Sequence, residues 1–193
     1  MIGRLRGTLA AVMGDRLIVD VAGVGYEVHV PTRGVTELPG VGEEVVLHTH
    51  LHVREDALTL FGFPSERGLT TFRLLLAAPG VGPRVALAVL STLDPDAVTL
   101  AIAEEDITTL ASVPGIGKRT AQKMVLELKP KVSAAEVAAV GSSGALTEVR
   151  LALGQLGYSD AEVAEVLPDV DPATTPEEQL RAALRSLAGR RRG

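Results

Sequence analysis

A short motif built on glycine occurs twice in the chain, 35 residues apart. The first copy is Pro79–Ala86 (PGVGPRVA) and the second is Pro114–Ala121 (PGIGKRTA). Two glycines on either side of one aliphatic residue allow a tight turn, and each copy has a helical pattern before it and an alanine-containing stretch after it. The repeat therefore predicts two similar units, each made of a helix, a tight turn and a second helix.

The turn of each copy is suited to holding an anion. Glycine brings bare backbone N–H groups to the surface at the start of a helix, where a phosphate can bind, and basic residues follow in both copies. Val81 and Ile116, between the glycines, are expected to anchor the turns in the core. A phosphate held in this way carries no base information, so binding to nucleic acid would be independent of sequence.

These turns have two other interpretations. A single turn of this kind is often an ordinary helix–helix connection, but two copies followed by basic residues favour phosphate binding. A nucleotide-binding Walker loop would need glycine in place of Ser112 and Ser or Thr in place of Arg119. The pattern fails at both positions, so no nucleotide-hydrolysis site is expected.

Composition excludes several classes of protein. Hydrophobic residues make up 46% of the 193, but only three Phe and two Tyr are aromatic, so the cores must be aliphatic. The absence of cysteine excludes disulfides, thiolate catalysis and cysteine-based metal sites. The net charge is −5, yet residues 64–135 carry eight Lys or Arg against seven Asp or Glu. The middle third is therefore locally basic, as a nucleic-acid contact requires.

No membrane segment is expected from the sequence. The longest stretches without a charged residue have eleven residues, as in Ile107–Gly117, against the roughly 18 that a spanning helix needs. The apolar run at Leu9–Met13 is too short for a secretory signal. We expect a cytoplasmic protein.

The first third alternates with the period of β-strands. Strands are predicted at 2–12, 16–21, 26–30, 45–53 and 57–61, with glycine at one turn and Arg54-Glu55-Asp56 at another. About five short antiparallel strands in some 60 residues predict a small barrel of the OB-fold type.

From Ser65 onward the period is helical. Ser65, Asp94 and Asp106 are expected to cap helices. Residues 132–145 have the composition of a flexible linker. The last unit has a helix start at Thr147 and two capping boxes, Ser159–Glu162 and Thr175–Glu178, and its final helix is expected to end at Gly189.

Two further clusters have more than one interpretation. His48, His50 and His52 share one face of a predicted strand and have a spacing that can ligate a metal, although solvated histidines are the more common case. Glu55 and Asp56 are either turn residues or a carboxylate pair for catalysis or Mg²⁺. No third carboxylate lies nearby in the sequence to complete such a site.

Five stretches in order along the chain form a recognisable set: MIGRLRG at 1–7, GVGYEVHVP at 23–31, REDA at 54–57, GVGP at 80–83 and PGIGK at 114–118. With these stretches the chain as a whole resembles the RuvA family, the bacterial subunits that bind Holliday junctions for branch migration in recombination, repair and the SOS response. Arg84, where a lysine is common, and Pro79, before the first turn, depart from the family pattern.

The resemblance implies an α+β multidomain fold. Its parts would be an N-terminal OB-fold barrel at 1–63, an all-α domain of two helix-hairpin-helix motifs at 64–131, a linker at 132–145 and a three-helix bundle at 146–193. It also implies a homotetramer, or two tetramers face to face as an octamer, that holds an open four-way junction. A RuvB hexameric motor would supply ATP hydrolysis, and a RuvC resolvase is a further partner.

The resemblance also assigns roles to residues. Those expected to bind DNA are Arg54, Gly80, Gly82, Arg84, Gly115, Gly117, Lys118, Arg119 and Lys123. Glu55 and Asp56 would form an acidic pin at the junction centre. Leu153, Leu156 and Tyr158, which look exposed, would dock the motor, although apolar residues of this kind can instead belong to a core. No catalytic residue, metal or cofactor is expected.

Two alternatives come from other classes of function. A helix-hairpin-helix glycosylase or nuclease would need a catalytic Asp downstream of the turn, but the next Asp after Lys118 is Asp160, beyond the linker. A pure protein-interaction module would not bind four-way DNA. A gel shift that compares a junction with linear duplex separates these possibilities.

Overall fold

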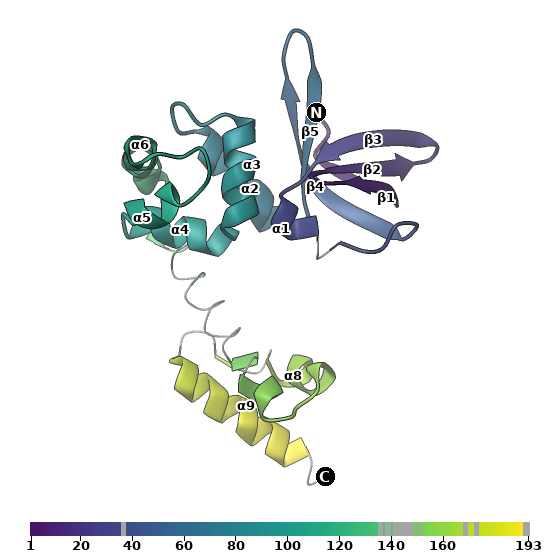
Figure 1. The fold of residues 1–193 in the computed structure, drawn as a ribbon. Helices are drawn as coiled ribbons and strands as arrows, with labels where there is room; N and C mark the ends of the chain where they lie inside the picture. The colour runs from purple at the N-terminus through teal and green to yellow at the C-terminus, as the bar shows by residue number, and fades with distance from the viewer. Residues whose placement is uncertain are drawn as a thin grey trace. The chain divides into compact units, whose positions relative to one another are not determined.

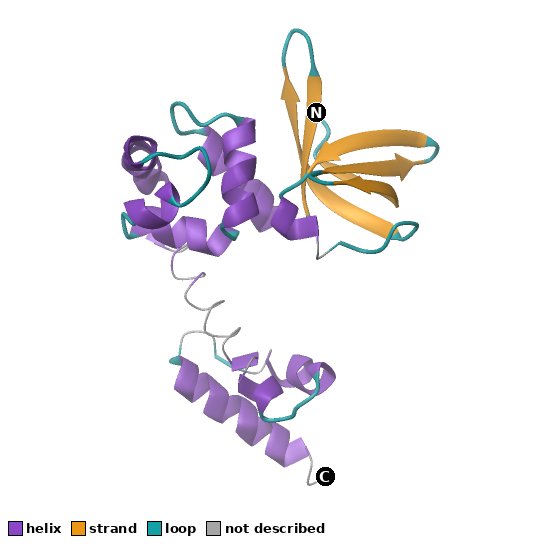
Figure 2. Ribbon diagram, in the orientation of Figure 1, coloured by secondary structure: helices purple, strands orange, loops and turns teal. Residues whose placement is uncertain are grey.

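The computed structural model describes residues 1–35, 38–134, 137, 140, 149–150, 152–167, 170–171 and 174–190. The chain divides into two compact units, Met1–Val132 and Ser133–Gly193 (Figure 1). In Figure 2 the strands all belong to the first unit, and the described part of the second unit is helical. The predicted linker at 132–145 and the predicted helix start at Thr147 fall largely outside the described residues.

Five strands close into a barrel in the order β1-β2-β3-β5-β4, which confirms the predicted barrel. The strands are β1 (Arg4–Met13), β2 (Arg16–Val21), β3 (Val24–His29), β4 (Glu44–Val53) and β5 (Leu58–Phe63). Alternate residues of each strand point inward, and the interior is aliphatic, as the composition predicts. Its buried side chains are Leu5, Leu9, Leu17, Val19, Val28, Val30, Val45, Leu47 and Leu60.

One strand pairing differs from the prediction. β3 and β5 run parallel, with Val28 opposite Leu60 and His29 opposite Phe61, whereas antiparallel strands were expected throughout. Directions cannot alternate around a closed ring with an odd number of strands, so one neighbouring pair must be parallel. The chain makes this pairing by crossing from β3 to β5 through a short helix and β4.

The rest of the first unit is helical. Its helices are α1 (Thr32–Val35), α2 (Glu66–Leu76), α3 (Pro83–Thr92), α4 (Pro95–Ala103), α5 (Ile107–Ala111), α6 (Lys118–Leu128) and the 3₁₀ helix η1 (Lys129–Lys131). The apolar faces of α2 to α6 meet in one core, which also contains Phe61 and Phe63 of β5. One wall of the barrel is thereby built into the helical core.

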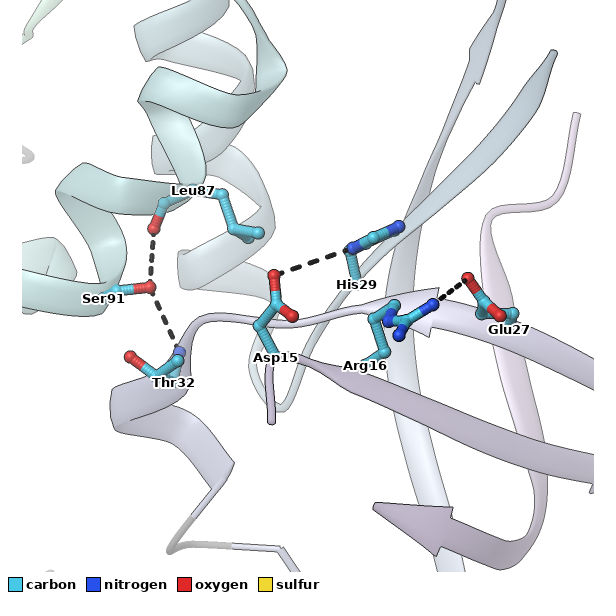
Figure 3. A network of polar contacts seen from close by, with 7 residues as sticks. All are labelled: Asp15, Arg16, Glu27, His29, Thr32, Leu87 and Ser91. Carbon is cyan, nitrogen blue, oxygen red and sulfur yellow. Dashed lines mark hydrogen bonds and ion pairs between the residues drawn. The ribbon is translucent and has the colours of Figure 1, made fainter. Parts of the chain in front are cut away.

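A polar network ties the barrel to the helices (Figure 3). The backbone N–H of Thr32, at the start of α1, donates to Ser91 Oγ at 3.1 Å, and the Ser91 hydroxyl donates to the carbonyl of Leu87 at 2.8 Å. On the barrel, Nδ1 of His29 lies 3.8 Å from Oδ2 of Asp15. Because α1 is held at the end of α3, the barrel and the repeated turns belong to one compact unit.

The second unit contains α8 (Asp160–Val166) and α9 (Pro176–Arg190), and residues 152–155 are also helical. Both predicted capping boxes are present, at the starts of α8 and α9. The prediction that Gly189 ends the last helix is wrong, because α9 continues to Arg190. Glycine inside a helix costs about 1 kcal/mol relative to alanine but does not stop the helix.

The helices can be compared in length and apolar character with a segment that could span a membrane. Of the helices in the described residues, none is by itself long and apolar enough to cross a bilayer. α3 and α4 pass that test only as a pair, and they are bent by 102° at their junction.

Candidate nucleic-acid interface

The two copies of the repeat fold into the same turn. In each, the aliphatic residue donates its N–H to the carbonyl three positions earlier, at 3.1 Å for Val81 and 3.0 Å for Ile116. The glycine before it has a positive φ, +83° at Gly80 and +88° at Gly115. Proline in the second position and a positive-φ glycine in the third are the features of a type II turn. The fold therefore requires Gly80 and Gly115 as glycine.

The geometry also accounts for Pro79. It occupies the second position of the first turn, as Pro114 does in the second turn, and a φ fixed near −65° is favoured there. Pro79 therefore supports the turn. The aliphatic residues that follow, Val81 and Ile116, are 5% and 4% exposed and belong to one core, so both turns are anchored as the sequence predicted.

Gly82 and Gly117 have a different role from the turn glycines. They are the N-cap residues of α3 and α6, with extended backbone at φ −87° and −84° that any residue can adopt. A Cβ added at either position would meet nothing within 4 Å. The fold therefore does not require glycine here. A glycine N-cap leaves the first-turn amides without a side-chain acceptor and lets a ligand approach the backbone closely.

Five other helix starts contrast with these two. Within the described residues, five further helices begin with a side-chain oxygen that accepts a backbone N–H of the first turn. They are α2, α4, α5, α8 and α9, capped by Ser65, Asp94, Asp106, Ser159 and Thr175. We call the N-termini of α3 and α6, at Gly82 and Gly117, the open helix starts.

Both open helix starts carry cationic side chains in the first turn. Neither α3 nor α6 has an acidic residue in its first turn, where Arg84, Lys118 and Arg119 lie instead. The helix dipole places partial positive charge at the N-terminus, so a cation there destabilises the helix. An anion bound at the same place offsets both positive charges and restores the lost stability. All three side chains are exposed, and so is Lys123, one turn beyond Arg119 on the same helix face. The two starts thus combine free donors with positive charge.

Lys129, another base of the same third of the chain, is engaged elsewhere. Its ammonium binds Glu105 at 2.5 Å. This hydrogen bond, together with the charge of Lys129, holds the pKa of the Glu105 carboxyl below its ordinary value. Lys129 therefore contributes less to the basic surface than its position in the sequence suggests.

The predicted acidic bend lies at the tip of the β4–β5 hairpin, which extends beyond the rest of the barrel (Figure 1). The Arg54 N–H donates to the Ala57 carbonyl at 2.9 Å and closes the loop. Glu55 and Asp56 are exposed and have no hydrogen bond or ion pair to any other described residue. The tip therefore presents two uncompensated carboxylates beside one arginine.

The histidines of β4 do not assemble into a metal site. The His50 and His52 rings are stacked with centroids 6.4 Å apart, and His50 meets the edge of Phe72. No group of three or more His, Asp or Glu side chains in the described residues can hold a metal ion. Burial, and then the charges of Arg73 and His52, lower the pKa of His50. The neutral, packed form of His50 is thereby favoured.

In the second unit, the three residues expected to dock a partner differ in exposure. Leu153 is fully buried, so the expectation that it is exposed is wrong. The N–H of Gly157 donates to Gly154 and that of Tyr158 to Leu153, which is a Schellman helix ending that turns Tyr158 back onto the core. Leu156, at the C-cap, is 60% exposed. Of the three, Leu156 is the residue open to a partner.

Comparison with known proteins covers nearly the whole chain. Residues 1–62 match the family model "RuvA N terminal domain", 72–130 match "SAM-like Helix-hairpin-helix tandem" and 144–188 match "RuvA, C-terminal domain". A "Holliday junction branch migration complex subunit RuvA" of Rubrobacter xylanophilus is 44% identical over 196 residues, covering 99% of this chain and all of that protein. The protein of the same name from Symbiobacterium thermophilum is 45% identical over 202 residues, covering 97% of this chain and 98% of the relative.

The chain belongs to the RuvA family. The resemblance inferred from the five sequence stretches is confirmed, and so is the fold class of barrel, helical tandem and C-terminal helical domain. In this member of the family the helix-hairpin-helix model covers α3 to α6 and both open helix starts.

Two features escaped the sequence reasoning. The sequence has Ser, Asp or Thr before five helices and Gly before two, so the contrast among helix starts could have been found there. Only the structure shows that the fold does not need Gly82 and Gly117. Val53 and Leu58 were not singled out, yet they are 63% and 72% exposed. Their signal was an apolar alternation that continues up to the hairpin tip.

Proposed function

We propose that this chain is the junction-binding subunit of a branch-migration complex and has no catalytic centre of its own. Membership in the RuvA family supports the proposal, and the observation that carries it is the pair of open helix starts at Gly82 and Gly117. Each offers main-chain donors and cationic side chains to a phosphate. Two such starts in one core suit two phosphates of one duplex arm.

The contacts to DNA would be made to the phosphate backbone and would not depend on base sequence. The turn glycines shape the approach, the N-cap glycines leave the amides open, and the cations add attraction. The residues we assign to this surface are Gly80, Gly82, Arg84, Gly115, Gly117, Lys118, Arg119 and Lys123, with Arg54 on the barrel hairpin. Each cation that binds a phosphate releases counterions, so binding weakens with salt.

Glu55 and Asp56 would form the acidic pin, which selects against continuous duplex. Beside a phosphate at about 8 Å, each carboxylate costs roughly 0.5 kcal/mol at the dielectric constant of water and about 2 kcal/mol at an effective value of 20. Four copies around a junction multiply this repulsion. An open junction leaves a phosphate-free centre, so the pin rejects the wrong partner more than it attracts the right one.

The proposed assembly follows the symmetry of the DNA. Four arms suit a homotetramer with one subunit on each arm, or two tetramers face to face. A RuvB hexameric motor would dock on the second unit through exposed Leu156, with Leu153 and Tyr158 supporting that surface from the core. A RuvC resolvase would approach the same junction. We place this assembly in the cytoplasm.

The decisive experiment compares the affinities of the full chain for a synthetic four-way junction and for a duplex with the same arm sequence. Tighter binding of the junction, unchanged when the arm sequences are scrambled, is the expected result. Equal affinity for the duplex would overturn the proposal. Strong dependence on arm sequence would contradict the assignment of the contacts to phosphates.

A variant of the pin tests the selection step. Glu55→Gln/Asp56→Asn should raise affinity for the duplex at least roughly tenfold at low salt, the factor for removing about 1.4 kcal/mol of repulsion from the two carboxylates of one subunit. The gain should shrink as salt screens the charges. Glu104→Gln/Glu177→Gln removes the same charge from exposed positions elsewhere and serves as the control. If both double variants behave alike, Glu55 and Asp56 act only through net charge.

A further inference from the structure

The β4–β5 hairpin carries an apolar face beyond the end of the barrel core. Leu51 pairs with Leu60 and Val53 pairs with Leu58, so the two pairs follow one another along the same face of the hairpin. Leu60 is buried and Leu51 packs against the barrel core, whereas Val53 and Leu58 are 63% and 72% exposed. The row of core-facing residues therefore continues past the core into solvent.

This exposed pair occupies an unusual place. It is the last strand pair before the loop that carries Glu55 and Asp56, at the tip of a hairpin that extends from the barrel. Single exposed apolar residues are common on protein surfaces, but two that are paired across strands, next to charged residues, form a small apolar patch. The fold does not need this patch, because neither side chain belongs to a core cluster.

The side chains at the hairpin tip are chemically better suited to DNA bases than to phosphates. The carboxylates of Glu55 and Asp56 repel phosphates. They accept hydrogen bonds from the exocyclic amino groups of bases, and the apolar pair beside them fits the flat face of an unstacked base. Aliphatic side chains of this size are used in other proteins as wedges between base steps. The tip as a whole is therefore suited to bases and unsuited to the backbone.

We propose that Val53 and Leu58 form an apolar wedge that contacts unstacked bases at the centre of the junction, with Glu55 and Asp56 keeping phosphates away from it. This inference rests on the proposed junction-binding function and deepens it. The wedge stabilises bases that have left one duplex arm before they pair in the next. Its contribution is to base opening, whereas the open helix starts supply most of the binding energy.

A second copy of this chain is the competing occupant of the patch. Four hairpin tips brought together would each carry Glu55 and Asp56 against one arginine, so their net negative charges would repel one another. Charge therefore disfavours tip-to-tip contact between copies and favours a partner that donates hydrogen bonds. Base fluorescence and sedimentation distinguish the two occupants.

The test uses the full chain and a four-way junction with 2-aminopurine, a base whose fluorescence rises when it unstacks, at the crossover. The wild type should raise the fluorescence. Val53→Thr/Leu58→Thr, which keeps residues suited to strands, should reduce that rise about fivefold while changing junction affinity by less than about threefold. Val24→Thr is the matched control, because Val24 is 55% exposed at the start of β3, next to another hairpin turn.

The outcomes separate this inference from the proposed function. An unchanged fluorescence rise in a folded double variant overturns the wedge but leaves junction binding intact. A changed molecular mass of the DNA-free double variant in sedimentation shows that the patch joins copies of the chain and also overturns the wedge. Failure of the wild type to prefer the junction over duplex refutes the proposed function itself.

Discussion

α5 and α6 follow one another in the chain, but their N-termini are built differently. α5 starts at Asp106, whose carboxylate accepts the backbone N–H groups of Thr108 and Thr109, both at 3.0 Å. α6 starts at Gly117, which has no side chain to offer, and its first turn contains Lys118 and Arg119. The same contrast separates α4, capped by Asp94, from α3.

The difference shows which helix starts serve the fold and which are available to a ligand. A capping side chain satisfies the first-turn amides within the protein and stabilises the helix by about 1 kcal/mol relative to alanine and by a few tenths of a kcal/mol relative to glycine. At Gly82 and Gly117 the space for such a side chain exists, because an added Cβ would meet nothing within 4 Å. The open starts therefore lack a stabilising contact that the fold would accept, as expected where a phosphate takes the place of the cap.

The largest effect should come from closing the open starts. Gly82→Asp/Gly117→Asp provides a capping carboxylate at both positions and should keep or raise stability by a few tenths of a kcal/mol. Junction affinity should fall at least about a hundredfold, since charge-assisted hydrogen bonds at two sites are lost. Thermal unfolding and fluorescence anisotropy measure the two quantities. Gly3→Asp, at another exposed glycine with open space, is the control.

If the aspartate variant bound the junction as well as Gly3→Asp does, both helix starts would be ordinary connections. A loss of folding would be equally informative, because it would show that the glycines serve the fold after all. Gly82→Ser/Gly117→Ser, which caps without adding charge, then distinguishes a blocked amide from simple repulsion.

Removing the cations at one open start should have the next largest effect. Lys118→Ala/Arg119→Ala should weaken binding to junction and duplex about equally, by at least roughly tenfold, and reduce the salt dependence of log K by roughly two units for each subunit bound to DNA. Arg181→Ala/Arg185→Ala removes the same charge from α9 and should leave the salt slope unchanged. An equal fall in slope for both variants would assign the effect to net charge alone.

Removing a cap from a closed start should affect stability without affecting binding. Asp94 Oδ1 accepts the Ala97 N–H at 2.8 Å, and Asp94→Ala should lower the free energy of unfolding by about 1 kcal/mol. Junction affinity of the folded variant should equal that of the wild type. Chemical denaturation and anisotropy test this, with Asp94→Asn as the variant that keeps a cap. Weaker junction binding by folded Asp94→Ala would break the division into open and closed starts.

The smallest expected effect is a pH dependence at the closed start of α5. Hydrogen bonds from Thr109 first, and from Thr108, hold the pKa of Asp106 below its ordinary value of 3.8. Its contribution to stability is therefore present above pH 3.8 and is lost as the pH falls through the lower folded-state value. The stability advantage of the wild type over Asp106→Asn should decline on acidification. An advantage independent of pH would contradict this account of the cap.

The sequence was sufficient for the elements whose signals are local. Strand alternation predicted the barrel, and Ser65, Asp94 and Asp106 marked their helices correctly, because these signals depend on a few neighbouring residues. The parallel pairing of β3 with β5 follows from ring closure, which is a property of the whole barrel. The burial of Leu153 depends on how the helices of the second unit pack, so its helical spacing alone did not reveal it.

The repeated motif located both turns, but it did not separate Gly80 and Gly115, which the turn requires, from Gly82 and Gly117, which it does not. That distinction depends on φ angles and on the space around each Cα. It moves the informative substitutions from the turn glycines to the N-cap glycines.

Amide hydrogen exchange of the full chain, with and without a four-way junction, tests the central claim most directly. We predict slower exchange on junction binding in peptides that cover 83–87 and 117–121, at the open helix starts. Peptides that cover 95–99 and 106–110, at the closed starts of α4 and α5, should exchange at unchanged rates. Protection at the closed starts with none at the open starts would contradict the account.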